Sequence, residues 1–175
     1  MLRIGSTAAG ALLAAGALLV AQGPAKTARA ELAGREGSDL RGTVTFREMG
    51  GHVHVHAEIE NAPPGVHGFH LHEKGDCSAA DFTSSGGHFN PAGVDHGAPG
   101  KDPHHAGDFG NLTVGDDGHG RLELHAMGLT VGEGPTSVVG RAVILHEKAD
   151  DLTSQPTGAA GARIACGVVE EMPAE

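Results

Sequence analysis

The sequence has no tryptophan and no tyrosine, and only 5 of its 175 residues are phenylalanine. Large aromatic side chains are frequent anchors at binding surfaces, so their scarcity removes one usual guide to a partner. Basic residues are also few, because 12 lysines and arginines stand against 22 aspartates and glutamates, for a net charge of −10. Nucleic-acid binding depends on basic side chains that contact phosphates, so this balance argues against nucleic acid as a partner.

Cysteine occurs only at Cys77 and Cys166, and the sequence has no CxxC motif. In an exported protein, a single pair of cysteines is expected to form one disulfide. That bond would close a loop of roughly ninety residues, for which the chain-entropy model gives on the order of 4–5 kcal/mol of stabilisation. A catalytic thiol is the weaker alternative, because the CxxC motif of redox cysteines is missing.

Long apolar runs are absent except at the N-terminus, where Arg3 precedes a run of alanine, leucine, glycine and valine from Ala8 to Ala21. The run is short for a membrane span and shows the charged-then-apolar order of a secretory signal peptide. A buried helix or a single anchor is the alternative, but no polar face appears in the run. We therefore expect an exported protein, periplasmic or secreted, with no membrane partner once the signal is removed.

The signal cleavage site has two candidates. The small-x-small motif ARA, at Ala28 to Ala30, lies far beyond the apolar run, and the surrounding TARAEL alternates like a first strand. We therefore expect cleavage earlier, between Ala21 and Ala25. The chain then divides into a signal peptide, residues 1–25, and one mature domain, residues 26–175.

After this region the sequence lacks helical periodicity, and short segments of alternating apolar and polar residues recur between Gly, Pro, Asp and Asn. Eight such segments are expected to be strands: 27–32, 42–48, 52–60, 66–73, 110–116, 120–126, 140–147 and 162–170. A period of two, with turn residues between the segments, is typical of an all-β sandwich or barrel.

Two long stretches without a strand pattern, 74–108 and 148–161, interrupt this series. The first carries a cluster of histidines and a terminal aspartate: His88, His96, His104, His105 and Asp108. Loops of this length inside a compact domain are usually functional or disordered.

Histidines also occur on the expected strands. Residues two apart share one face of a strand, so His70 and His72 form a side-by-side pair that leads into the histidine-rich loop. The segment HVHVH places another three on one face: His52, His54 and His56. A simple turn follows this second set, so we interpret it as a solvated face and leave adventitious metal binding open.

Imidazoles and carboxylates are ligands of borderline metals. Outside HVHVH, seven residues could form such sites: His70, His72, His88, His96, His105, Asp108 and His146. Copper(II) favours tetragonal nitrogen coordination and zinc favours four tetrahedral ligands, so a site for each would need eight ligands. One histidine that binds through both ring nitrogens would supply the eighth.

The motifs GFHLHEKGDCS, GGHFNP, HAGDFGN, VILHEKADD and GARIACGVV, in this order, closely resemble those of the copper/zinc superoxide dismutase family, bacterial exported type. A single HxH is common, whereas the ordered set is highly specific and spans nearly the whole mature chain. The resemblance implies an eight-stranded Greek-key β-barrel of the immunoglobulin-like sandwich class, with long loops that hold metals outside the barrel. It also implies the disulfide between Cys77 and Cys166.

The resemblance further implies a role for each ligand-type residue. The copper ligands would be His70, His72, His88 and His146. The zinc ligands would be His88, His96, His105 and Asp108, with His88 as the bridge; the spacing H-x-G-D selects His105 over His104. Asp150 would link a copper ligand to a zinc ligand, and Arg163 beside the copper would receive the anion, so that Arg163 and His88 are the catalytic residues.

The implied activity is the dismutation of superoxide to dioxygen and hydrogen peroxide by a copper redox cycle, with a structural zinc. The implied partner is this small anion, and the implied assembly is a monomer or a homodimer. A non-catalytic extracytoplasmic copper/zinc-binding module is the main alternative, although every copper-ligand position and Arg163 are present. After Lys148 no basic residue precedes Arg163, so weak long-range steering of the anion is expected.

Overall fold

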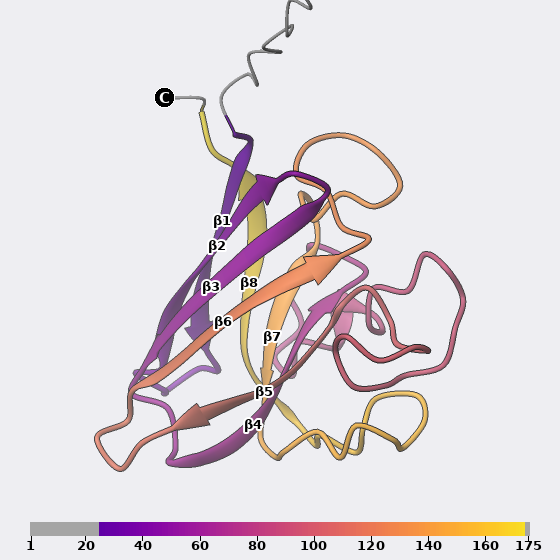
Figure 1. The fold of residues 1–175 in the computed structure, drawn as a ribbon. Helices are drawn as coiled ribbons and strands as arrows, with labels where there is room; N and C mark the ends of the chain where they lie inside the picture. Colours follow the sequence, from indigo (N-terminus) through magenta and orange to yellow (C-terminus); the bar gives the residue numbers. More distant parts are fainter. Residues whose placement is uncertain (1–24, 174–175) are drawn as a thin grey trace, which may run out of the picture.

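The computed structural model describes residues 25–173. Its eight strands close into an antiparallel barrel in the order β1-β2-β3-β6-β5-β4-β7-β8 (Figure 1). The strands are β1 (Thr27–Gly34), β2 (Arg41–Met49), β3 (His52–Glu60), β4 (Gly65–His72), β5 (Asp108–Val114), β6 (Gly120–Met127), β7 (Ala142–His146) and β8 (Arg163–Glu171). Each strand overlaps one of the eight predicted segments, and the order, in which β3 pairs with β6 and β4 pairs with β7, is that of a Greek key. The predicted fold class is therefore confirmed.

The predicted signal peptide, residues 1–25, lies outside the described residues except for Ala25. Residues 25–173 contain no helix that is long and apolar enough to cross a membrane.

Strand alternation produces the barrel core. In β3 the side chains of Val53, Val55 and Ile59 are buried, while the histidines and glutamates between them face outward. Three buried phenylalanines fill the centre: the ring centroid of Phe109 lies 6.4 Å from that of Phe46 and 6.1 Å from that of Phe69. Burial of such side chains contributes roughly 1.5–3 kcal/mol each, which makes the barrel a stiff support for its loops.

Strand β7 differs because all five of its residues are buried. Val143 and Leu145 belong to the barrel core, whereas Ala142 and Ile144 face the other way and pack in a second, smaller cluster with Phe82 and the disulfide. The apolar run of β7 is thus explained by a loop that covers its outer face. His146 ends this strand at the edge of the covering loop.

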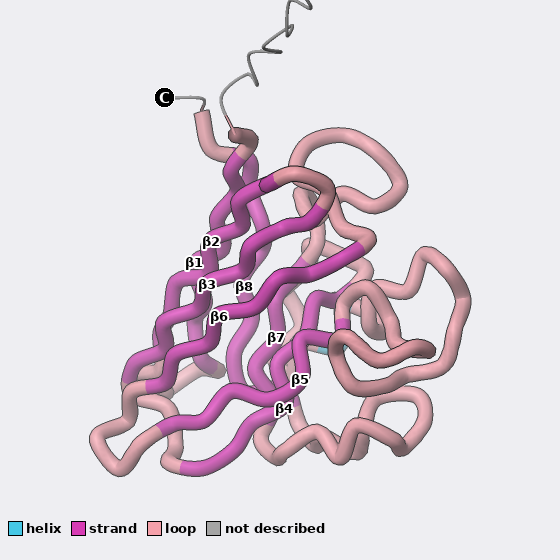
Figure 2. The backbone as a smooth tube through the Cα atoms, viewed as in Figure 1, coloured by secondary structure: helices cyan, strands magenta, loops and turns pink. Residues whose placement is uncertain are grey.

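Two long loops lie outside the barrel on the same side (Figure 2). The β4–β5 loop contains one short 3-10 turn, Thr83–Ser85, and otherwise has no regular structure. The β7–β8 loop reaches it through a hydrogen bond from the backbone amide of His96 to Gln155 Oε1, 2.8 Å long. The stretches predicted to lack strands correspond to these two loops, except that Asp108, predicted to lie in the first, begins β5.

Candidate metal centre

Two strands and one loop bring four buried histidines together. His70 and His72 come from β4, and His146 comes from the neighbouring β7. A single β-bridge between His72 and His88 draws the β4–β5 loop back over β4. One ring nitrogen from each of these four residues lies within 4.8 Å of the others.

A second group shares His88 with the first. It contains one ligand-type atom from each of His88, His96, His105 and Asp108, again within 4.8 Å of one another, and all four residues are buried. The structure thus brings together all seven residues predicted from the sequence, in two groups joined at His88. His104 stays outside both groups, and its Nδ1 lies 3.2 Å from the carbonyl oxygen of Lys101.

The hydrogen bonds of the rings show which nitrogens are free. In the first group, His72 Nδ1 lies 3.0 Å from the carbonyl oxygen of Gly86, and His146 Nδ1 lies 3.3 Å from that of Gly161. A carbonyl only accepts, so each Nδ1 carries the hydrogen and each Nε2 carries a lone pair. The two Nε2 atoms face each other at 3.4 Å, an arrangement that a cation between them would stabilise.

Other buried nitrogens of the two groups are left without hydrogen-bond partners in the described structure. They are His70 Nδ1, His88 Nε2, His96 Nδ1 and His105 Nδ1. A buried polar atom without a partner carries a desolvation cost of about 1–3 kcal/mol. Four such atoms aimed into two neighbouring groups fit metal ligands, so the residues present are those that metal ions would need.

Asp108 organises the second group at the start of β5. Its Oδ2 accepts hydrogen bonds from the backbone amides of His105, at 2.8 Å, and Gly97, at 3.1 Å. Its Oδ1 lies 2.7 Å from His88 Nδ1 and 3.0 Å from His96 Nδ1. The loop therefore bends around one carboxylate, whose second oxygen faces the imidazoles.

The pKa shifts of four of these residues favour their ligand forms, whereas for His96 burial is outweighed by the hydrogen bond to Asp150 and the nearby carboxylates, which raise the pKa. Burial lowers the pKa values of His70 and His72 well below the ordinary value, and the nearby His88 lowers them further. Burial also lowers the pKa of His146 to about 4. Burial raises the pKa of Asp108, but hydrogen bonds from His88 and two backbone amides outweigh it and hold that pKa well below its usual range. Neutral imidazoles and an ionised carboxylate are the forms that bind metals.

Asp150 links the two groups from the β7–β8 loop. Its Oδ2 lies 2.8 Å from His70 Nε2, and its Oδ1 lies 2.9 Å from His96 Nε2. Both imidazoles donate to this buried carboxylate, so their Nδ1 lone pairs point into the two groups. Gly158 packs against the link, since a Cβ there would lie 1.7 Å from Asp150 Oδ1.

Two amide side chains that the sequence analysis did not identify fix this arrangement. Asn111 on β5 donates to the carbonyl oxygen of Asp150 and accepts from its amide, at 2.9 and 2.7 Å. Gln155 makes the same reciprocal pair with the backbone of His96, at 2.9 and 2.8 Å. No sequence signal predicts either contact, because each joins residues at least 39 positions apart.

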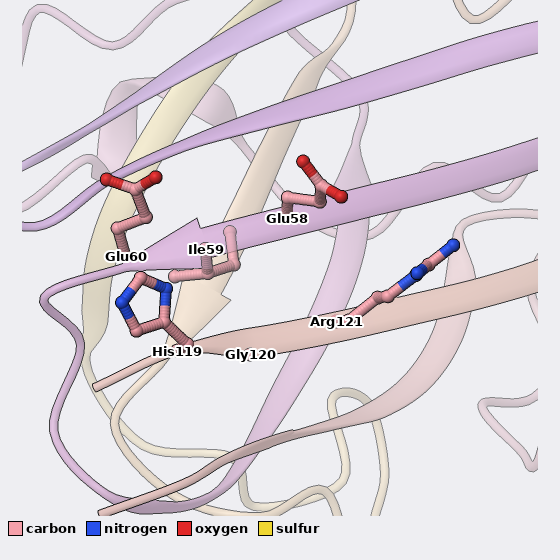
Figure 3. Close-up of a pocket in the computed structure, with 6 residues that line it drawn as sticks. All are labelled: Glu58, Ile59, Glu60, His119, Gly120 and Arg121. Atoms are coloured by element: carbon pink, nitrogen blue, oxygen red, sulfur yellow. The ribbon is translucent and has the colours of Figure 1, made fainter. Parts of the chain in front are cut away.

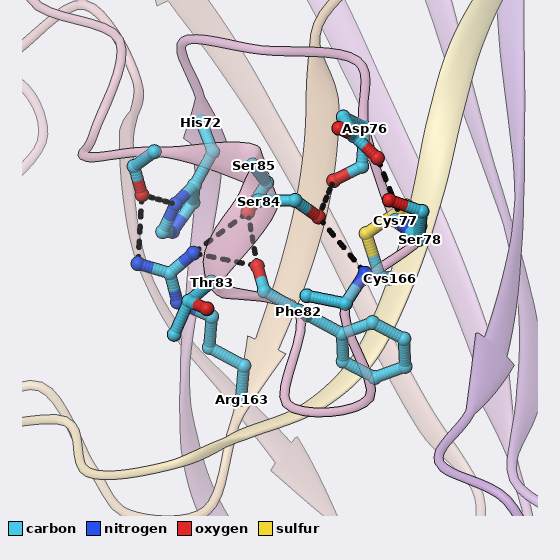
Figure 4. Close-up of a disulfide and its surroundings, with 12 residues drawn as sticks. His72, Asp76, Cys77, Ser78, Phe82, Thr83, Ser84, Ser85, Arg163 and Cys166 are labelled. Atoms are coloured by element: carbon cyan, nitrogen blue, oxygen red, sulfur yellow. Dashed lines mark hydrogen bonds between the residues drawn. A yellow bond between two sulfur atoms is a disulfide. The ribbon is translucent and has the colours of Figure 1, made fainter.

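Arg163, at the start of β8, lies beside the first group. It pairs with His146 across β7 and β8, and its Nη2 donates to the carbonyl oxygen of Gly86, the acceptor that His72 also uses. Its Nη1 donates to the carbonyl oxygen of Phe82, at 2.7 Å, and lies 2.8 Å from Ser85 Oγ (Figure 4). Of the five N–H groups of a guanidinium, these bonds use three and fix the plane of the rest.

The predicted disulfide between Cys77 and Cys166 is present and joins residues 89 positions apart. It ties the β4–β5 loop to β8, three residues from Arg163 (Figure 4). The loop segment that holds Arg163 is therefore attached covalently to the strand that carries Arg163.

A surface hollow elsewhere on the barrel wall does not contain this chemistry. It lies between β3 and β6 (Figure 3), and it is lined by Glu58, Ile59, Glu60, His119, Gly120 and Arg121. It contains none of the seven residues of the two donor groups, so the buried histidine groups are the candidate site.

Comparison with known proteins agrees with this geometry. The family model described as copper/zinc superoxide dismutase matches residues 40–169. The solved structure of a protein described as the clock protein EA4 is 40% identical, with a TM-score of 0.76, and the match covers 85% of this chain and 96% of that one. A double mutant of a SOD-like protein from Bacillus subtilis is 39% identical, with a TM-score of 0.72, and the match covers 80% and 95%. The chain therefore belongs to the copper/zinc superoxide dismutase family.

Proposed function

We propose that this protein dismutates superoxide to dioxygen and hydrogen peroxide, with copper as the redox metal and zinc as a structural metal. The observation that carries the proposal is the set of four buried imidazole nitrogens that converge beside Arg163. A protein that only stores metal needs no fixed guanidinium next to its nitrogen group.

The donor atoms suggest which metal each group takes. The first group, His70, His72, His88 and His146, offers nitrogen alone and suits copper, whereas the second adds the carboxylate of Asp108 and suits zinc. His88 would serve both, through Nε2 toward the first group and Nδ1 toward the second.

Copper, when bound, supplies the one-electron chemistry that oxidises one superoxide to dioxygen and reduces the next to peroxide. The chain supplies the rest. Arg163 docks the anion through charge-assisted hydrogen bonds from its remaining N–H groups. His88 Nε2, the unpartnered buried base of the first group, would hold a proton that the peroxide product needs when this nitrogen is not bound to copper. The fixed second nitrogens of His70 and His72 keep their rings in place throughout.

The test is superoxide decay catalysed by residues 26–175 with the disulfide formed, loaded with copper and zinc and compared with the metal-free protein. Fast decay that disappears with copper removal would support the proposal. Full metal uptake without acceleration would overturn it, and would leave a non-catalytic module that binds copper and zinc.

Export is part of the proposal. The disulfide is compatible with an oxidising compartment, periplasmic or extracellular. Cleavage after Ala30 would remove half of β1, in which Ala28 and Ala30 are buried and pair with Phe46 and Val44 of β2. Removal of residues 1–25 instead leaves this strand whole, as does any earlier cut.

Asp150→Asn should lower the affinity of one of the two metal groups by about 10- to 100-fold, the usual cost of losing a partner behind a ligand. The asparagine keeps one acceptor but turns an NH2 group toward the other imidazole N–H, so either His70 or His96 loses its anchor. Competition titrations with zinc and copper chelators measure the effect.

Asp151→Asn is the matched control, since the exposed Asp151 carboxylate bonds only within its own turn, to Thr153 and Ser154. Unchanged metal affinity in Asp150→Asn, or an equal loss in both variants, would show that the link between the groups has no such role.

The catalysed rate should depend weakly on salt. Lys148 is the only basic residue between His146 and Arg163, while Glu147 and Asp151 oppose it. We expect a change below about twofold as the Debye length shortens from about 30 Å to about 10 Å, between about 0.01 and 0.1 M salt. A several-fold fall over this range, measured as kcat/KM, would show that strong steering operates.

A further inference from the structure

The outer face of the barrel carries a second group of donors that the metal centre does not use. His52 and His54 of β3 lie against His125 of β6: the ring centroids are 4.8 Å apart for His52 and His125, and 5.1 Å apart for His54 and His125. His54 and His125 are direct partners in the strand register. From the sequence, the segment HVHVH is interpreted as a solvated face. In the structure, His52 and His54 of this segment form a cluster of three imidazoles with His125 of another strand.

Two methionines flank this group in the same register. Met49 of β2 and Met127 of β6 stand directly opposite His52, one on each side. Both are among the exposed large apolar side chains, at 42% and 63% exposure. Directly opposed residues on one face of a sheet have Cβ atoms about 4.5–5.5 Å apart, so each methionine side chain can reach an ion bound at His52.

The imidazoles of this face are not part of either buried donor group. His52 Nε2 is shielded from solvent and has no hydrogen-bond partner among the described residues. His56 Nε2 on the same face is also without a hydrogen-bond partner, with Glu58 Oε1 3.5 Å away. The unpartnered nitrogen of His52 lies at the end of β3 that pairs with Met49 and Met127.

This group is separate from the metal centre. Strands β6 and β5 stand between β3 and β4, and the side chains that alternate with His52 and His54, those of Val53 and Val55, point into the barrel core. An ion held on this face would therefore be outside the barrel and would share no ligand with the buried groups.

The donor chemistry selects the metal. Imidazole nitrogen suits several ions, but thioether sulfur is soft and favours Cu(I). The neighbouring charge points the same way, because Arg47 is the β2 partner of His54 and repels a divalent ion more than a monovalent one. The carboxylates of this face, Glu58 and Glu123, belong to the rows beyond, where Glu123 is the partner of His56.

We propose that Met49, His52, His54, His125 and Met127 form a surface site for Cu(I), distinct from the copper of the proposed dismutase reaction. The protein would then bind one copper ion at the first donor group, for the proposed reaction, and another on the outer face of the barrel. The site depends on cross-strand register and stands whether or not the protein is catalytic.

The experiment uses the copper- and zinc-loaded protein, with Cu(I) kept reduced by ascorbate and titrated without oxygen against a chromophoric Cu(I) chelator. We expect one further equivalent of Cu(I) beyond the metals already bound. The triple variant His52→Ala/His54→Ala/His125→Ala should lose this equivalent. Met49→Leu/Met127→Leu should bind it at least about tenfold more weakly, because soft ligands are replaced by inert ones of similar shape.

Matched controls come from exposed residues away from the cluster. His119→Ala and Met172→Leu should keep the additional equivalent. Among the variants that still bind it, copper X-ray absorption should show sulfur neighbours that are lost only in the Met49/Met127 variant. No additional equivalent, or one that the triple variant retains, would overturn the proposal. Loss in the histidine variant with no change in the methionine variant would overturn the thioether assignment. Superoxide decay should be equal in all variants, which keeps failure of this site distinct from failure of the proposed activity.

Discussion

His146→Ala should abolish catalysed superoxide decay, with a loss greater than about a hundredfold, while zinc uptake continues. The variant removes one of the four nitrogens of the first group but none of the second. Losses of about 10- to 100-fold follow when only a partner behind a ligand is removed, so loss of a ligand itself should cost more. Superoxide decay and metal analysis of the purified protein measure the two effects.

His104→Ala serves as the control, since this histidine sits in the ligand loop but outside both groups. It should retain both metals and full activity. Activity that survives in His146→Ala, or zinc that is lost together with copper, would contradict the division into two groups.

The double variant Cys77→Ser/Cys166→Ser should lower the free energy of unfolding of the metal-free protein by about 4–5 kcal/mol in the chain-entropy model. The bond spans 89 residues, so its absence frees a large loop in the unfolded chain. Activity of the metal-loaded variant should fall as well, since the freed loop contains the carbonyl groups of Phe82 and Gly86 that hold Arg163. Denaturant unfolding and superoxide decay test the two parts.

The oxidised wild type and the double variant should be compared with and without a thiol reductant. Reductant should destabilise the wild type and leave the variant unchanged, because the variant has no bond to reduce. A difference in unfolding free energy below about 1 kcal/mol would show that the metal-free loop is held by other contacts.

The strands were predictable because apolar and polar residues alternate with a period of two, and this alternation indicates which face of each strand is buried. Val53, Val55 and Ile59 show this pattern directly. The order of strands in the barrel was available only through family resemblance, since the sequence does not state that β3 pairs with β6.

The seven ligand-type residues were predictable for a similar reason: their types and order match a known pattern. The contacts behind them were not. Asn111 and Gln155 bind backbone groups. Every residue has the same backbone groups, so the sequence does not indicate which of them a side chain will contact. The cluster around His125 was hidden as well, because it depends on the register between two strands far apart in the chain.

His88 and Asp150 each touch both donor groups, and this has a thermodynamic consequence. An ion in either group fixes a ring, or a carboxylate, that the other group also needs. The first ion to bind therefore orders a residue that the second ion also needs, and the second ion binds without that loss of conformational entropy. The two uptake steps should be positively coupled. By linkage the coupling is reciprocal: whatever factor zinc contributes to copper affinity, copper must return to zinc.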